Sequence, residues 1–147
     1  MADISLRPIT EENFRPVIRM KVRDDQTSFV ADNVTSIAQA YIYPTSKPFA
    51  LYADDELVGF TWLNREADTG IDWIIRFMIG ADHQGKGYGR AALKTIIEYL
   101  KQQPDVKQIR LSYVPGNEIA ESLYRKVGFE ATGEVDDGEI VMTLQAM

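Results

Sequence analysis

The chain of 147 residues contains no cysteine and a single histidine, His83. Without cysteine there can be no disulfide, no thiolate nucleophile and no metal bound by cysteine. One histidine gives no basis for a metal site built from histidines, so we expect no metal cofactor. The chemistry of this protein must therefore use hydroxyl, carboxylate, cationic and backbone groups.

Long apolar runs and an excess of positive charge are also missing. No stretch approaches the ~18 consecutive apolar residues of a membrane span, and residues 1–5 lack the pattern of a secretory signal. We therefore expect no membrane partner and a cytoplasmic location. The net charge of −6 disfavours nucleic-acid binding, which needs a basic surface. The acidic charge favours solubility and would also suit a cationic substrate.

The length and the order of apolar patterns predict one domain over residues 1–147. Periodicity and turn residues predict the order β, α, α, β, β, β, α, β, α, β, β, which indicates a mixed sheet in the α+β or α/β class. The expected strands cover residues 4–8, 48–53, 57–63, 71–79, 108–114, 129–135 and 139–144. The expected helices cover residues 11–22, 33–41, 84–102 and 118–127, with Thr10, Asn33 and Asn117 as N-caps.

A glycine-rich segment, Gln84–Gly89, follows the apolar strand that ends at Gly80. Glycine has no Cβ to shield the backbone N–H groups. These groups lie at the N-terminus of the next helix, where the helix dipole favours an anion. Lys86 and Arg90 add positive charge, and we predict that the segment binds a phosphate.

Two known phosphate-binding patterns fit this segment poorly. The P-loop pattern G-x-x-x-x-G-K runs from Gly80 to Lys86, but Gly87 follows where a hydroxyl should bind magnesium. The dinucleotide pattern G-x-G-x-x-G begins at Gly85 but meets Arg90 at its last position. An ordinary glycine-rich turn before a helix is the remaining alternative.

A third pattern, Gln/Arg-x-x-Gly-x-Gly, fits Gln84–Gly89, and a second motif lies nearer the C-terminus: N117-x-x-A-x-x-L-Y124-x-x-V-G-F129. In this order, the two motifs resemble those of the GNAT superfamily of acetyl-CoA-dependent N-acetyltransferases, over essentially the whole chain. The resemblance implies the GNAT acyl-CoA N-acyltransferase fold, a central twisted mixed sheet of about seven strands flanked by about four helices. Within the superfamily, the chain most resembles bacterial spermine/spermidine (diamine) N-acetyltransferases, at R76-F77, Q84-G-K-G87, L123-Y124 and the closing segment G133–M142 with Glu139.

The resemblance implies acetyl-CoA as co-substrate and no metal. The loop N–H groups would bind its pyrophosphate, and its pantetheine arm would pair with residues 77–79. That pairing requires this strand to splay apart from residues 109–114. An N–H near Met78 or Ile79 would then stabilise the developing oxyanion. The predicted cofactor-binding residues are Phe77, Met78, Ile79, Gln84, Gly85, Lys86, Gly87, Tyr88, Gly89, Arg90, Asn117 and Tyr124.

The resemblance places Tyr124 at the position of the general acid that protonates the leaving thiolate. Its reference pKa of ~10 is close to that of a thiol. A core aromatic is the alternative role for Tyr124, and a plain N-cap is the alternative for Asn117. The general base is either Asp72 or, as we prefer, a water relay. His83 is expected to be exposed.

The expected acceptor is a small primary amine, and we expect a polyamine such as spermine or spermidine. The acetyl group would pass to it directly in a ternary complex. A polyamine needs carboxylates, and the substrate-binding candidates are Asp24, Asp25, Asp32 and Asp72, together with Arg76. Asp24 and Asp25 are alternatively plain loop residues, and Arg76 either pairs with a carboxylate or faces an edge. A protein N-terminus, a lysine or an aminoglycoside is the alternative acceptor. A non-catalytic acyl-CoA-binding module and a homodimer also stay open.

Overall fold

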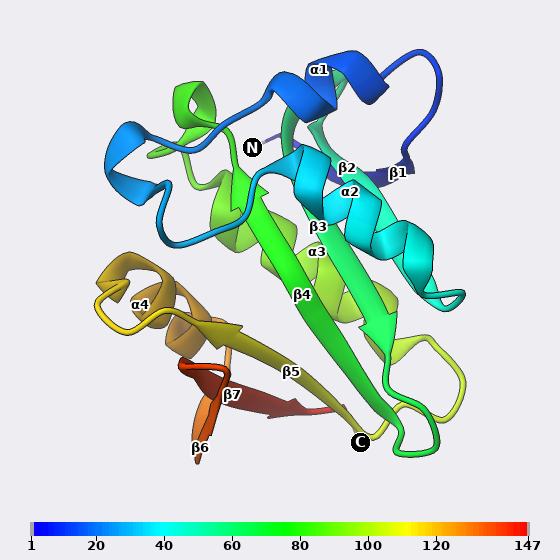
Figure 1. Cartoon of the computed structure of the whole chain (residues 1–147), viewed down its shortest axis with the longest axis vertical. Coiled ribbons are helices and arrows are strands. Elements are labelled where there is room, and N and C mark those ends of the chain that lie inside the picture. Colours follow the sequence, from blue (N-terminus) through cyan, green and yellow to red (C-terminus); the bar gives the residue numbers. More distant parts are fainter. Residues whose placement is uncertain (1, 147) are drawn as a thin grey trace.

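The computed structural model describes residues 2–146, which build a seven-stranded sheet with the order β1-β2-β3-β4-β5-β7-β6 (Figure 1). The strands are β1 Ile4–Pro8, β2 Ser46–Ala53, β3 Glu56–Arg65, β4 Ile71–Ile79, β5 Gln108–Tyr113, β6 Glu130–Asp136 and β7 Glu139–Gln145. The helices are α1 Phe14–Arg19, α2 Asn33–Ile42, α3 Tyr88–Lys101 and α4 Glu118–Lys126, with short 3-10 turns η1 Asp24–Gln26 and η2 Ala81–His83. The predicted order of elements and the α+β class are confirmed.

The sheet is antiparallel except between β4 and β5. A parallel pair needs a long crossover connection, and α3 provides it. This crossover brings the glycine-rich segment to the end of β4, where α3 begins. The β6–β7 hairpin closes the other edge of the sheet.

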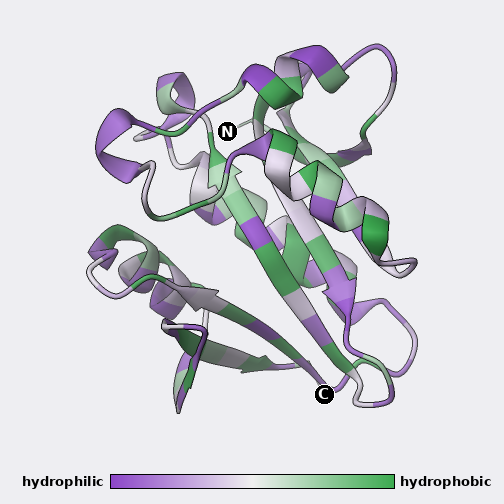
Figure 2. Cartoon of the chain, viewed as in Figure 1, coloured by the Kyte–Doolittle hydropathy of each residue, from purple (hydrophilic) through white to green (hydrophobic). Residues whose placement is uncertain are grey.

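Neighbouring strand residues point to opposite faces of the sheet and join separate cores. Leu51 and Ile79 pack with the apolar stripe of α3 on one face, whereas Ala50 and Met78 pack with α1 and α2 on the other. Figure 1 shows α3 behind the sheet and α1 and α2 in front of it. Figure 2 shows that β3 and β4 carry mostly hydrophobic residues between these layers. No helix within residues 2–146 is both long and apolar enough to cross a membrane.

Helix α1 is shorter than the sequence pattern predicts, and its predicted cap is wrong. The helix begins at Phe14 after Asn13, so Thr10 is not the N-cap. Pro16 explains the late start, because a proline is tolerated only in the first turn of a helix. In a helix that began at residue 11, the ring of Pro16 would clash with the backbone carbonyl group one turn earlier.

Helix α2 is capped one residue before the predicted position. The carboxylate of Asp32 accepts a hydrogen bond from the backbone N–H of Thr35 at 2.7 Å. Asn33 is instead buried, and its side-chain amide donates to the carbonyl oxygen of Val17 at 2.9 Å. The helix ends at Ile42, before Pro44, as predicted.

Candidate active site

The parallel strands β4 and β5 separate partway along their length. They pair only from Ile71–Ile74 to Gln108–Leu111. On the other side of β4, Trp62 pairs with Arg76 and Leu63 pairs with Ile74, so Ile75 is an extra residue. Such a β-bulge bends a strand. The bend falls where pairing with β5 ends, and the two strands diverge beyond it (Figure 1).

A cavity of about 700 Å³ lies where the strands diverge. One wall is the second half of β4, and the opposite wall is the end of β5 with helix α4. Segment 22–31, between α1 and α2, and the start of the glycine-rich loop complete the lining. Loop, strand and helix elements from distant parts of the sequence therefore meet at one site.

The backbone of β4 presents free polar groups to this cavity. The N–H of Gly80 donates to the carbonyl oxygen of Val58 on β3 at 2.9 Å. Backbone groups alternate sides along a strand, so those of Met78 also face β3, whereas those of Phe77 and Ile79 face the cavity. The geometry therefore favours Ile79 over Met78 as the oxyanion donor.

The glycine-rich segment forms an open turn ahead of α3. Gly85 and Gly87 have positive φ angles of 78° and 83°, which favour glycine. Gly87 is the N-cap of α3, so the N–H groups of the first turn have no acceptor within the helix. Lys86 and Arg90 are exposed beside this turn. The arrangement suits an anion, as the sequence predicts.

The side chains of Gln84 and Tyr88 hold the turn against its neighbours. The amide of Gln84 donates to the carbonyl oxygen of Ile79 at 2.9 Å and to Oε1 of Gln26 at 2.8 Å. A Cβ added at Gly89 would lie 3.4 Å from Leu123, so α3 and α4 approach closely there. Tyr88 packs against the core.

Tyr124 lies on α4 and lines the cavity while its side chain is almost entirely buried. Its ring packs against those of Tyr113 and Phe129, with centroids 6.3 and 6.2 Å away. Burial, and secondarily the carboxylate of Glu139, raises the pKa of the Tyr124 hydroxyl well above its usual value. The hydroxyl therefore keeps its proton at neutral pH, and it is a weaker acid than a free phenol.

Asn117 both caps α4 and lines the cavity. Its side-chain oxygen accepts a hydrogen bond from the N–H of Ala120 at 3.3 Å. At the other end of the helix, Gly128 has a φ of 111° and follows the C-cap, Val127. The N-cap is as predicted, and the two ends fix α4 beside β5.

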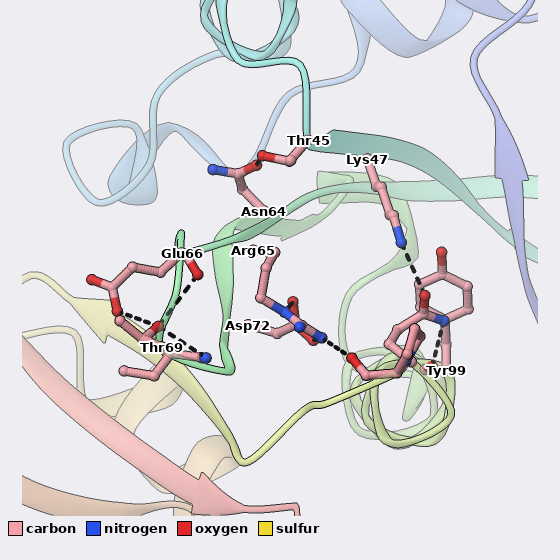
Figure 3. Close-up of polar contacts among 11 residues, drawn as sticks. Thr45, Lys47, Asn64, Arg65, Glu66, Thr69, Asp72 and Tyr99 are labelled. Carbon is pink, nitrogen blue, oxygen red and sulfur yellow. Dashed lines mark hydrogen bonds and ion pairs between the residues drawn. The ribbon is translucent and has the colours of Figure 1, made fainter.

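The predicted substrate residue Asp72 does not line the cavity. It is 4% exposed, and its carboxylate oxygens accept hydrogen bonds from Arg65 at 2.7 and 2.9 Å (Figure 3). It lies on the paired half of β4, before the bulge. The charge of the carboxylate is already paired with that of Arg65, so we assign Asp72 a structural role and do not include it in the site.

The other predicted acidic residues also lie outside the cavity lining. Asp24 and Asp25 are exposed on η1, and Asp25 pairs with Arg23 at 3.4 Å. Asp32 caps α2, and its hydrogen bonds from Thr35 lower the pKa of its carboxyl group. The segment that carries these aspartates does wall the cavity, but through its other residues.

Arg76 lines the cavity, and its partners are neutral. Its guanidinium donates to Oε1 of Gln39 at 3.0 Å and to the carbonyl oxygen of Ile75 at 3.1 Å. It also lies 5.7 Å from the centre of the Trp62 ring, within range of a cation–π contact. Of the two roles considered for Arg76, pairing with a carboxylate is therefore not seen among residues 2–146.

Sequence reasoning gave no role to several polar residues of the lining and misplaced His83. Arg23, Ser112 and Glu139 are among them, and all three line the cavity. Glu139 follows a hairpin turn and belongs to the segment that carries the subfamily resemblance, but no site role was predicted for it. His83 was expected to be exposed but is half-buried in the lining. No metal-binding group of three His, Cys, Asp or Glu residues occurs among residues 2–146.

Comparison with known proteins identifies the class. The sequence profile of the acetyltransferase (GNAT) family matches residues 9–129. The chain belongs to this family and is an acetyltransferase. Its fold also matches a spermidine N-acetyltransferase from Vibrio cholerae in complex with CoA and spermine. That match has a TM-score of 0.78 at 18% identity and covers 98% of this chain and 96% of that one.

Relatives within the family have named acceptors. The chain is 32% identical to a spermine/spermidine N(1)-acetyltransferase of Bacillus subtilis (strain 168), over 95% of this chain and 96% of the relative. It is 34% identical to an aminoglycoside N(6')-acetyltransferase type 1 of Klebsiella pneumoniae, over 59% of this chain and 44% of the relative.

Proposed function

We propose that this acetyltransferase moves the acetyl group of acetyl-CoA directly to a primary amine, with Tyr124 as general acid. One observation carries the proposal: free backbone groups of β4, the glycine-rich turn and the buried hydroxyl of Tyr124 converge on one cavity. Acyl transfer needs an anchor for the cofactor, a donor for the oxyanion and a proton for the leaving group. These elements supply all three.

The cofactor would bind along the divergent half of β4. N–H groups at the start of α3 would bind the pyrophosphate, with Lys86 and Arg90 beside it. The pantetheine arm would pair with the backbone of Phe77 and with the N–H of Ile79, whose carbonyl oxygen already accepts from Gln84. This places the thioester near the end of β4, between the oxyanion donor and Tyr124.

A polyamine such as spermine or spermidine is the proposed acceptor. The support is similarity over nearly the whole length of the Bacillus subtilis relative. The structure adds a constraint, because Glu139 is the one carboxylate of the lining among residues 2–146. A single carboxylate fits one ammonium group of the acceptor and leaves the remaining amines to solvent.

Release of CoA with different amines tests the proposal. A thiol-reactive dye reports the released CoA without a signal from the protein, because the chain has no cysteine. The assay compares spermine, spermidine, kanamycin, a peptide with a free N-terminus and no acceptor. We expect turnover with the polyamines. Turnover only with kanamycin or the peptide would move the acceptor to those classes, and acetyl-CoA binding without turnover would indicate a non-catalytic module.

A further inference from the structure

The charged groups of the cavity are unequally distributed between its two walls. Arg23 and Arg76 come from the side of the η1 segment and β4, whereas Glu139 comes from β7. Within the described residues it is the only carboxylate of the lining. A cationic acceptor that enters this cavity therefore meets its one opposite charge at Glu139.

Glu139 is held in place but not neutralised. The hydroxyl of Ser112 donates to its Oε1 at 3.0 Å, and Ser112 also lines the cavity. No side chain or backbone group of residues 2–146 donates to its Oε2, and no cation pairs with it. One oxygen therefore orients the carboxylate, and the other is free for a ligand. The contrast with Asp72 is direct, because Arg65 binds both oxygens there.

Glu139 and Tyr124 flank the same part of the cavity. Tyr113 on β5 pairs with Ile140, the residue after Glu139, and its ring packs against Tyr124. The carboxylate is close enough to contribute to the raised pKa of the Tyr124 hydroxyl. A phenolic hydroxyl and a carboxylate that lie on one wall are the kinds of group that acid–base transfer requires.

We propose that Glu139 binds the acceptor ammonium group and accepts its proton before attack, an inference that rests on the proposed acetyl transfer. The freed amine then attacks the thioester, so that an N–C bond forms and the C–S bond breaks. Of the two protons that the nitrogen loses, one passes through Glu139 to solvent. Tyr124 gives its own proton to the sulfur and is reprotonated by the second nitrogen proton.

The pH dependence of this step reflects every charged group around Glu139. Asp136 of β6 pairs with it in the hairpin, and Tyr113 and Tyr124 flank it from β5 and α4. Across the cavity lie Arg23, Arg76 and His83. All of these neighbours are retained in the variants below. A difference between the pH profiles of a Glu139 variant and the wild type therefore reports Glu139 itself.

The test compares Glu139→Gln with the wild-type protein, using spermidine and kanamycin as acceptors. Glutamine keeps the size of the side chain and can still accept from Ser112, but it cannot take a proton. We expect kcat/KM to fall about 100-fold near neutral pH, while acetyl-CoA affinity stays within about twofold. The loss should shrink at high pH, where solvent deprotonates the amine. Glu130→Gln, an exposed carboxylate on β6 of the same hairpin, is the matched control and should behave as wild type.

Two outcomes would overturn the inference, and they can be told apart. A wild-type protein that acetylates no acceptor of the full panel, including spermine and the peptide, refutes the proposed function and this step with it. An active wild type with an equally active Glu139→Gln variant and an unchanged pH profile refutes the role of Glu139 alone. If the glutamine variant does not fold, Glu139→Asp keeps the charge and withdraws it by one methylene. It should then lose activity without losing acetyl-CoA affinity, and full activity would again refute the role.

Discussion

At the residue scale, Tyr124 and Asp72 show how burial gives similar polar groups different tasks. Both are almost inaccessible to solvent. The carboxylate of Asp72 is bound on both oxygens by Arg65, whereas Tyr124 lines a cavity and its phenol keeps its proton. A buried polar group with all its partners stabilises the fold, and one that faces a cavity is available for chemistry.

Replacement of Tyr124 by phenylalanine should lower turnover without weakening the cofactor complex. The substitution removes only the hydroxyl, so the ring contacts with Tyr113 and Phe129 remain. We expect kcat to fall about 100-fold or more, as for loss of a general acid, with acetyl-CoA affinity nearly unchanged. Steady-state kinetics and calorimetry measure the two quantities. Tyr99→Phe, on α3, is the control, and wild-type turnover by the Tyr124 variant would exclude this role.

Replacement of Asp72 by asparagine should lower stability instead. Asparagine leaves the guanidinium of Arg65 partly unpaired at a site where residue 72 is only 4% exposed. We expect the free energy of unfolding to fall by about 2 kcal/mol in a urea titration, with acetyl-CoA affinity unchanged. Asp55→Asn is the control. Its exposed pair with Arg7 should contribute under about 1 kcal/mol. Equal effects in both variants would contradict the argument.

At the element scale, the local patterns with strong chemical constraints predicted the structure best. The positive φ angle of Gly128 and the cap by Asn117 follow from the second motif. The start of α1 was not, because its hydrophobic period extends past the limit that Pro16 sets. The tertiary position of Glu139 was not predictable either. It depends on β7 lying beside β5, a pairing between segments far apart in the sequence.

Substitution of Gly87 by valine should disrupt the anion-binding turn. Its φ of 83° strains any residue with a Cβ, and the side chain would stand where a phosphate approaches. We expect acetyl-CoA affinity, measured by calorimetry, to fall at least tenfold. Gly133→Val is the matched control, because Gly133 has the same φ of 83° on exposed strand β6. It should lose similar stability but bind the cofactor normally. Equal affinities in the two variants would refute this role of the turn.

Substitution of Asn117 by alanine separates the two roles of this residue. Loss of the cap on α4 should lower the free energy of unfolding by about 1 kcal/mol. Asn117→Asp keeps an N-cap of similar strength but places a negative charge in the cavity lining. If Asn117 also contacts the cofactor, the aspartate variant should regain stability yet bind acetyl-CoA more weakly. Full recovery of both properties would leave Asn117 as a cap only.

At the scale of the whole molecule, the sheet consists of two parts joined by a short parallel seam. Strands β1–β4 form one part, and β5, β7 and β6 form the other. Backbone pairing joins them only between Ile71–Ile74 and Gln108–Leu111, with α3 and its core beneath. Where the strands diverge, the cavity takes the place of further pairing. A cofactor in this cavity would contact both parts and replace the missing hydrogen bonds.

Cofactor binding should therefore stabilise the protein and protect specific amides. At a CoA concentration of 100 times Kd, the free energy of unfolding should rise by about 2.7 kcal/mol in a denaturant titration. Hydrogen exchange should slow at the amides of Phe77 and Ile79, which face the cavity. Arg76 and Met78 serve as internal controls, because their N–H groups face β3 and are already paired. Slowing at the control amides, with none at Phe77 or Ile79, would show that the pantetheine arm does not follow β4.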